Sequence, residues 1–404
     1  MLVIERSVSG SWDVTIELVN WHELVHLHGT VAKRAFEDLM APELQAWRIQ
    51  PQDISICDNL WFVRLSSGSV FDGVEPLLVQ AILEASLMAS RVVIDGVGIP
   101  PIVRVNGGTR SPDRGGLAAR VVTGWQDRGA QTRDLVAAAG LLDAIGQGRA
   151  HFAFQEIVDM GSGRTMYHEA LLRMAGGGDA EAPSAPLAAI CAVERVGLAF
   201  RLDYSVLRSV CDLLEAHPAL RLGCNVSASS LAPSAWWELF LRKLDRQGDL
   251  ASRLVIEITE TAAIPDKEAA CRLLVRLREA GCTIAIDDFG AGQTSMAFVM
   301  AVQPGIIKID RSLLIAARDN EAYANYLKHM VAAFRSLQDC TVIAEGVETL
   351  IDCQIALAAG VGGGQGFLLH QPATRMPWAP HPCSLADAFR PLARKGLGRL
   401  PAFV

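Results

Sequence analysis

Apolar positions in the second half of the chain fall into eight short runs with the spacing of β-strands. They lie at 151–158, 166–174, 220–227, 253–260, 282–288, 305–310, 341–348 and 362–369. Longer segments with helical periodicity, such as 268–281 and 322–338, separate most of these runs. Strands that alternate with helices predict parallel βα units. About eight such units in one domain predict a closed, TIM-like (β/α)8 barrel.

The first part of the chain has a shorter α/β pattern. Strand-like runs lie at 12–19, 58–66 and 91–98, and helical runs lie at 20–40 and 74–89. A Gly- and Arg-rich stretch follows and predicts a connection between domains. We therefore expect a small α/β domain before the barrel. The expected limits are 1–106 for this domain, 107–134 for a linker, 135–380 for the barrel and 381–404 for a C-terminal tail.

A polar residue stands at or near the C-terminal edge of most barrel strands. These residues are Glu169, Asn225, Glu257, Asp287, Lys308 and Glu345. One such residue alone would be explained as a strand end or a helix cap. In a βα barrel, however, the C-terminal edges of the strands converge on the face that carries the active site. The set therefore predicts one cluster of acids, an amide and a lysine.

The segment CTIAIDDFGAGQTS, residues 282–295, places Asp287 and Asp288 side by side after a buried strand. Adjacent buried carboxylates repel each other and lose hydration, so they require compensating cations. Oxygen ligands without sulfur favour Mg²⁺ or Mn²⁺ over zinc. Two such ions suit in-line displacement at phosphorus, in which one ion activates water. The pattern predicts metal-assisted phosphoester hydrolysis and leaves the ester open.

Composition narrows the class of protein. The chain has 404 residues, a net charge of −7 and no tract rich in lysine and arginine, which argues against binding a nucleic-acid polymer. Nine scattered cysteines without a C-x-x-C pair favour reduced thiols. We find no signal peptide and no apolar run that could cross a bilayer. We expect a soluble cytoplasmic protein that does not bind a membrane.

Seven motifs together resemble the EAL-domain family, the phosphodiesterases that linearise cyclic di-GMP. They are YHEALLR, NVSASSL, LVIEITET, IAIDDFGAGQTS, IIKIDRSLL, VIAEGVET and GQGFLLHQP. They occur in family order over about residues 135–375. The resemblance implies metal-dependent hydrolysis of cyclic di-GMP to linear pGpG, which would lower the level of this second messenger in bacterial signalling.

The resemblance also implies a role for each matching residue. The implied ligands of two Mg²⁺ or Mn²⁺ ions are Glu169, Asn225, Glu257, Asp287 and Asp288, with Asp287 shared by both ions. The implied catalytic residues are Lys308, Glu345 and Glu260. Lys308 would orient the attacking water, Glu345 would serve near the second metal or accept a proton, and Glu260 would anchor the loop after Asp288. The implied substrate-binding residues are Gln155, Arg173, Gln365 and Asp310, with Arg173 paired to a phosphate.

Several positions depart from the family pattern. Met174 stands where tryptophan is usual, Glu156 replaces a common proline, and Ala291 and Gln293 alter the loop after Asp288. These changes spare the metal ligands but touch ligand contacts. A catalytically silent receptor that reports cyclic di-GMP to a partner is therefore the alternative. We also expect a homodimer, with the 288–295 loop linking its interface to the metals.

The N-terminal domain is weakly similar to the GGDEF domain that often precedes an EAL domain. In that alignment Val19 takes a metal-aspartate position and Val25 a guanine-binding position, while residues 57–61 replace the signature turn. The resemblance implies a degenerate domain that does not cyclise GTP. Such a domain would be a regulatory or dimerising module that could contact a protein partner.

An H-E-x-x-H string in the N-terminal domain raises a competing enzyme class. His22 and His26 would share one helix face and could bind zinc, with Glu23 as the base of a metalloprotease. The extended pattern would want a third histidine where Ala32 stands. Solvated helix histidines are therefore the preferred interpretation.

Overall fold

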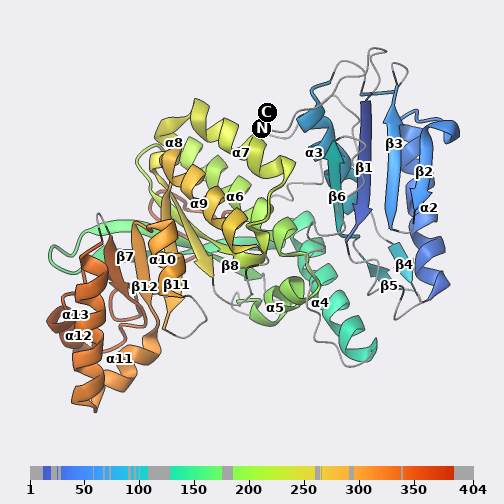
Figure 1. Cartoon of the computed structure of the whole chain (residues 1–404). Helices are drawn as coiled ribbons and strands as arrows, with labels where there is room; N and C mark the ends of the chain where they lie inside the picture. Colours follow the sequence, from blue (N-terminus) through green and yellow to red (C-terminus); the bar gives the residue numbers. More distant parts are fainter. Residues whose placement is uncertain are drawn as a thin grey trace.

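The computed structural model describes most of the chain in two α/β parts. The described residues are 12–19, 25, 29–57, 59–66, 69–71, 74–89, 92–94, 97–99, 101–107, 128–174, 185–259, 264, 266–290, 295–337 and 340–385. Figure 1 shows the N-terminal part in blue beside a larger part coloured green to red. Within the described residues, no helix has both the length and the apolar character needed to span a membrane.

The N-terminal part is a four-stranded sheet in the order β2-β3-β1-β6, with helices and a hairpin beside it. Its strands are β1 (Trp12–Leu18), β2 (Ile54–Cys57), β3 (Leu60–Leu65) and β6 (Val103–Gly107), the helices are α2 (Thr30–Ala46) and α3 (Pro76–Ala89), and the hairpin is β4 (Val92–Ile94) with β5 (Val97–Ile99). Alternate residues of β1, such as Val14 and Ile16, are buried in a core that includes Phe36 of α2 and Leu83 of α3. This is the period-two pattern of a strand covered on one face.

Two N-terminal expectations need correction. The run expected as one strand over 91–98 forms the two strands of the β4–β5 hairpin. Its sequence contains Asp95-Gly96, a dipeptide that favours a two-residue hairpin turn. The sheet also has β2 and β6, which the sequence pattern did not predict. Both are short strands that become recognisable through pairing with β3 and β1.

The larger part is a closed eight-stranded barrel in the order β10-β11-β12-β13-β14-β7-β8-β9, which confirms the expected fold class. Its strands are β7 (Ala150–Asp159), β8 (Thr165–Met174), β9 (Leu222–Ser227), β10 (Leu254–Thr259), β11 (Thr283–Phe289), β12 (Ile306–Ile309), β13 (Thr341–Ala344) and β14 (Gly363–Gly364). Its helices are α4 (Arg128–Gly146), α5 (Leu187–Arg195), α6 (Ala199–Ala216), α7 (Ala235–Arg246), α8 (Gly248–Ser252), α9 (Lys267–Glu279), α10 (Met296–Val302), α11 (Arg311–Arg318), α12 (Glu321–Arg335) and α13 (Leu350–Ala359).

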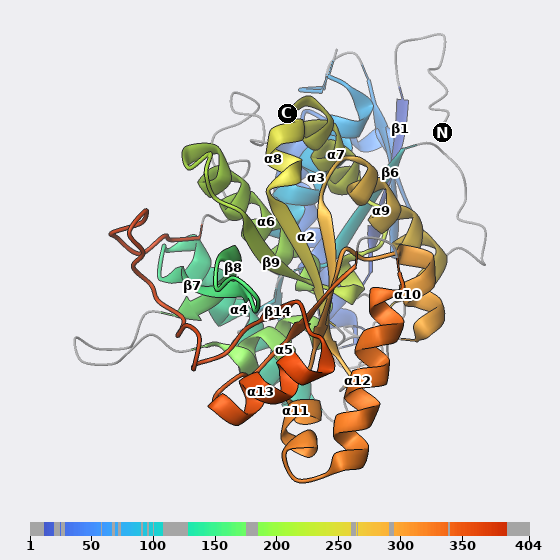
Figure 2. The ribbon, with the colours of Figure 1, turned by 90° about the vertical axis from the view of Figure 1, so that its left-hand side faces the viewer.

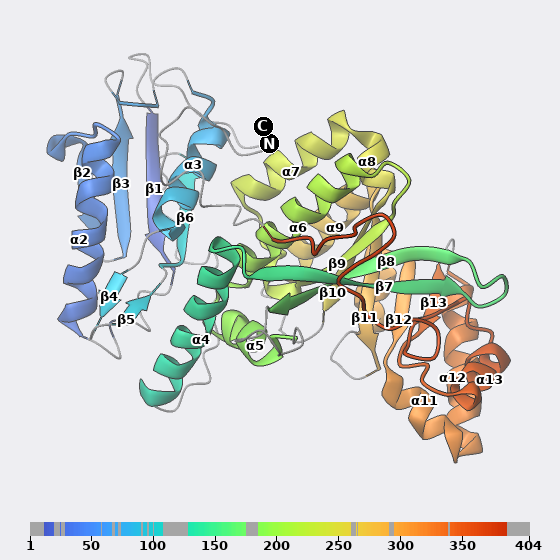
Figure 3. The same cartoon turned by 180° about the vertical axis from the view of Figure 1, so that it is seen from behind.

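One barrel strand runs against the others, which corrects the expectation of uniformly parallel βα units. β7 pairs antiparallel with both β8 and β14, while the other neighbouring strands pair parallel. Only a tight turn joins β7 to β8, closed by the Asp159 N–H donating to the Arg164 carbonyl at 2.9 Å. A parallel neighbour would need a crossover of a dozen or more residues. Figure 3 shows β7 and β8 as two long green strands that lie side by side and are joined by a loop at one end.

The inside of the barrel has an apolar layer beneath a polar one. The apolar layer consists of Ile157, Tyr167, Val255, Ala285, Ile306 and Ile343, all at most 2% exposed. On the parallel strands, the residue two positions further along points to the same side of the sheet. These residues include Glu169, Glu257, Asp287, Lys308 and Glu345. The apolar layer therefore supports the polar face from below.

The two parts share one apolar core and several polar contacts. α7 packs against α3 (Figures 1 and 2), and Arg242 of α7 forms an ion pair with Glu75 at 2.5 Å. The Arg201 guanidinium of α6 donates to the Met88 carbonyl near the end of α3.

The expected domain limits stay a prediction, with β6 ending at Gly107 and α4 starting at Arg128. The expected linker is largely outside the described residues, and so is the tail beyond residue 385.

Asp352 at the start of α13 should contribute strongly to folding. Arg318 donates to both of its oxygens at 2.7 and 2.9 Å, and Thr349 donates through N–H and hydroxyl. Burial alone would raise the pKa of Asp352, but these bonds outweigh it and bring the pKa to about 2. Asp352→Asn should therefore lower the free energy of unfolding by about 2 kcal/mol at pH 7. Urea denaturation measures this loss.

The pH dependence of this effect has a definite sign. A depressed carboxyl pKa stabilises the fold above the ordinary aspartate pKa, and the contribution disappears as pH falls toward about 2. The difference in unfolding free energy between wild type and Asp352→Asn should therefore shrink as the pH falls from about 5 to about 2. Asp319→Asn, at an exposed neighbouring site, is the control. An equal loss in both variants would contradict the prediction.

Candidate active site

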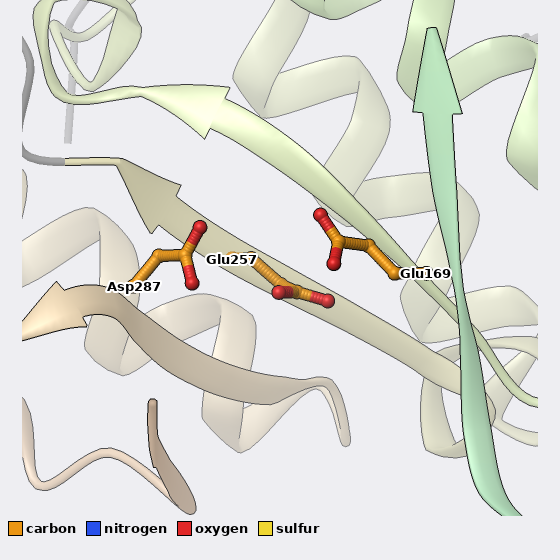
Figure 4. A group of neighbouring side chains, drawn as sticks. All are labelled: Glu169, Glu257 and Asp287. Atoms are coloured by element: carbon orange, nitrogen blue, oxygen red, sulfur yellow. The ribbon is translucent and has the colours of Figure 1, made fainter. Parts of the chain in front are cut away.

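Acidic side chains from separate strands meet at the C-terminal face of the barrel. Figure 4 shows Glu169 of β8, Glu257 of β10 and Asp287 of β11 pointing toward one another. Each offers an oxygen within 4.8 Å of the oxygens of the other two. Asp287, Asp288 and Glu345 form a second such group. Asp287 belongs to both groups, so the geometry has two adjoining sites with one shared carboxylate.

A β-bulge explains how two neighbouring aspartates reach the same cluster. In the β11–β12 pairing, Ile286 lies opposite Ile307 and Phe289 opposite Ile309, so the two aspartates face the single residue Lys308. Neighbouring side chains of a regular strand point to opposite faces. The bulge changes this alternation, and Asp288 has a positive φ of 50°. Aspartate tolerates this left-handed conformation better than most residues.

Lys308 lies at the centre of the acidic cluster. Its Nζ is 2.7 Å from Glu257, 2.8 Å from both Asp287 and Glu345, and 3.2 Å from Glu169. Burial lowers the pKa of Lys308, but the carboxylates outweigh it and raise the pKa well above its ordinary value. An ammonium group has three protons. It therefore stays charged and cannot satisfy four carboxylates at once.

Burying these carboxyl groups beside one another shifts their pKa values. Burial raises the pKa of Glu257 to about 8 and that of Asp287 to about 6, and neighbouring acids add to the effect. Burial also raises the pKa of Glu345 well above its ordinary value. For Glu169, burial is outweighed by Lys308 and by amide donors, so its pKa is lowered. Protonation and one lysine offset this charge only in part.

The donor set fits divalent cations. Five carboxylates and one ammonium leave four negative charges when ionised, which two divalent ions would neutralise. Asn225 Oδ1 is a buried acceptor that receives no hydrogen bond from the described residues. All available ligand atoms are oxygens, the type that Mg²⁺ and Mn²⁺ prefer. The residues present therefore fit the pair of ions expected from the sequence.

The two glutamines expected to contact substrate form a chain that braces Glu169. Gln365 Nε2 donates to Glu169 at 2.7 Å and to Gln155 Oε1 at 2.9 Å. Gln155 Nε2 donates in turn to the His370 carbonyl at 2.9 Å. Asn225 Nδ2 donates to the other Glu169 oxygen at 2.7 Å. These amides fix the orientation of Glu169, and their contact with substrate stays a prediction.

Two of the remaining expected site residues, Arg173 and Asp310, form hydrogen bonds with residues outside the acidic cluster. Arg173 is half-buried on β8 and donates to the Leu172 carbonyl at 2.9 Å. Asp310 caps α11 by accepting from the Ser312 N–H at 2.9 Å. Their roles toward a substrate stay predictions. Glu260, the loop residues Ala291 and Gln293, and the His22–Glu23–His26 string all lie outside the described residues.

Sequence reasoning missed Tyr167, whose ring fills the barrel directly beneath the acids. Its hydroxyl is buried. Burial first and the Glu257 carboxylate second raise the pKa of Tyr167 well above its ordinary value. The available signal was spacing. Tyr167 stands two residues before Glu169 in a strand, so both point into the barrel.

The comparisons with known proteins agree with this fold. The sequence model of the EAL domain family matches residues 138–372. The chain therefore belongs to the EAL domain family. A cyclic di-GMP phosphodiesterase of Pseudomonas aeruginosa is 33% identical over 253 residues, which cover 60% of this chain and 42% of that protein. The phosphodiesterase NbdA of the same organism is 30% identical over 54% of this chain and 28% of its own length. The chain thus spans less than half of each relative.

Solved structures extend the comparison of fold. A structure described as the PaMucR phosphodiesterase in a c-di-GMP complex is 27% identical, with a TM-score of 0.51, over 59% of this chain and 98% of that one. The S helix-GGDEF-EAL portion of LapD from Vibrio cholerae is 16% identical, with a TM-score of 0.53, over 89% of each chain. At that identity the second likeness is one of fold alone, and it extends through the N-terminal part.

Proposed function

We propose that this chain is a metal-dependent phosphodiesterase that hydrolyses cyclic di-GMP to linear pGpG and so lowers this second messenger in bacterial signalling. The observation that carries the proposal is the pair of carboxylate groups that share Asp287. Shared carboxylates are typical of two-metal sites that act on phosphoesters. The phosphodiesterase names of the relatives support the same substrate.

The chain's own residues divide the work as follows. Glu169, Asn225, Glu257 and Asp287 would hold one ion, and Asp287 with Asp288 would hold the other. Bound Mg²⁺ or Mn²⁺ would supply charge neutralisation and a more acidic water. Lys308, which lies within 3.2 Å of four carboxylates, would orient that water. Glu345 lies beside Asp288 and Lys308 and would accept a proton. Arg173 would pair with a phosphate of the substrate.

Product analysis tests this function directly. Purified protein incubated with cyclic di-GMP and Mn²⁺ or Mg²⁺ should produce pGpG, and an excess of chelator should abolish the product. Chromatography separates the linear product from the cyclic substrate. Binding of the dinucleotide without any pGpG, in the presence of either ion, would reject hydrolysis and favour the receptor alternative.

The receptor alternative has one structural observation in its favour. Helix α6 touches the N-terminal part through Arg201, and its Asp203 accepts the Ser227 N–H of β9 at 3.0 Å. β9 also carries Asn225, so α6 physically joins the N-terminal part to a proposed ligand. A degenerate GGDEF-like N-terminal domain, unable to cyclise GTP because Val19 lacks a carboxylate, would then act as a regulatory module. The expected homodimer belongs to the same proposal.

A further inference from the structure

The Tyr167 hydroxyl is a buried donor that has no partner among the described residues. Tyr167 is 1% exposed, and its Oη receives and donates no hydrogen bond there. The other side chains of its layer are aliphatic: Ile157, Val255, Ala285, Ile306 and Ile343. Below the ring, Arg221 lies 5.8 Å from its centroid and donates to Thr283 at 2.8 Å. An unsatisfied buried hydroxyl is costly, so a nearby acceptor is expected.

The matching acceptor is one oxygen of Glu257. Glu257 is fully buried, and its two oxygens have different surroundings. Oε2 forms an ion pair with Lys308 Nζ at 2.7 Å, and neither oxygen receives a hydrogen bond of regular geometry from the described residues. Among the charged groups, the Glu257 carboxylate also raises the pKa of Tyr167 the most. The Tyr167 hydroxyl therefore lacks an acceptor, Glu257 Oε1 lacks a donor, and both lie inside the barrel.

Gly223 of β9 keeps the space between these two groups open. A Cβ atom at this position would lie 2.2 Å from Glu257 Oε1 and 2.7 Å from Tyr167 Cε2. Both contacts are shorter than real Cβ atoms tolerate, so any larger residue would displace the carboxylate or the ring. The absence of a side chain at Gly223 thus lets the carboxylate oxygen and the hydroxyl-bearing edge of the ring lie close together. At such a short separation, one buried water can bridge a donor and an acceptor.

We propose that Tyr167 is a positioning residue for Glu257, whose Oε1 it holds by a hydrogen bond carried by one buried water. This leaves Oε2, on the side of Lys308, for a metal ion. The proposal rests on the two-metal function above. Groups that hydrogen-bond a metal ligand from behind fix its orientation, and losing one typically weakens metal binding by about 10- to 100-fold.

Tyr167→Phe tests the proposal with a readout that does not depend on activity. The variant keeps the ring in its packed layer and removes only the hydroxyl. Mn²⁺ affinity, measured by calorimetry without substrate, should fall about tenfold. The melting temperature of the metal-free protein should change little, because the ring stays packed in its layer. The control is Tyr204→Phe, which removes another buried hydroxyl, one carried by helix α6.

The outcomes separate this inference from the proposed function. The control should keep wild-type Mn²⁺ affinity even if it melts earlier. Equal Mn²⁺ affinity in wild type and Tyr167→Phe would overturn the positioning role and leave the two-metal function standing. A lower melting temperature of metal-free Tyr167→Phe with unchanged Mn²⁺ affinity would likewise reduce Tyr167 to a packing residue. Failure of the wild type to bind Mn²⁺ would reject both proposals together.

Discussion

Asp287→Asn should abolish most hydrolysis of cyclic di-GMP, with turnover reduced by about a hundredfold or more. Asp287 is the one carboxylate common to both metal-binding groups. The substitution keeps the shape of the side chain and removes its charge, so both ions should bind more weakly. Calorimetric titration with Mn²⁺ should show the loss of affinity, and product analysis should show the loss of turnover.

Asp288→Asn is the matched control because it alters the neighbouring carboxylate, which belongs to one group only. Asparagine also tolerates the left-handed backbone of this position, so the bulge should persist. This variant should keep one ion bound while turnover still falls by about a hundredfold. Both variants should fold. If instead both melted earlier and bound Mn²⁺ as the wild type does, the aspartates would be structural caps and the two-metal assignment would fail.

Lys308→Met should destabilise the metal-free protein by about 3–5 kcal/mol, the scale found when one member of a buried ionic cluster is removed. The ammonium is 1% exposed and lies against four carboxylates, so its loss leaves their repulsion unopposed. Turnover should fall as well if Lys308 orients the attacking water as proposed. Urea denaturation in the presence of chelator measures the loss of stability.

Mn²⁺ should restore much of this lost stability, because divalent ions would neutralise the same carboxylates. Lys243→Met is a useful comparison, since Lys243 is also largely buried but forms its ion pair with Glu215, at 2.8 Å, outside the acidic cluster. Its destabilisation should be smaller and should not respond to Mn²⁺. If Mn²⁺ left the stability of Lys308→Met unchanged, the carboxylates would not be binding the ion.

The residues of the site could be found from the sequence because strand periodicity is local. A polar residue that follows an apolar run marks the end of a buried strand, and barrel topology brings such ends together. Glu169, Glu257 and Asp287 were recognisable in this way, and the structure brings them within reach of one another. The closed barrel was likewise predictable from the succession of strands and helices.

The partners of these residues were decided by the tertiary structure. The amide chain that braces Glu169 joins residues about two hundred positions apart, Gln155 and Gln365, and no local pattern reports such a contact. The reversed direction of β7 follows from a short turn and from barrel closure by β14. Both depend on which strands become neighbours, a property of the whole fold.

The sequence by itself determined which side chains point into the barrel, since alternation along each strand fixes this for Glu169 and equally for Tyr167. Only the tertiary structure decided that Asp287 and Asp288 serve one cluster. Regular alternation would have sent them to opposite faces, and the bulge opposite Lys308 arises from pairing with β12. It also decided that Gly223 leaves room where the Tyr167 ring and Glu257 meet. Periodicity is carried by neighbours in the chain, whereas register and close packing are set by residues that meet only after folding.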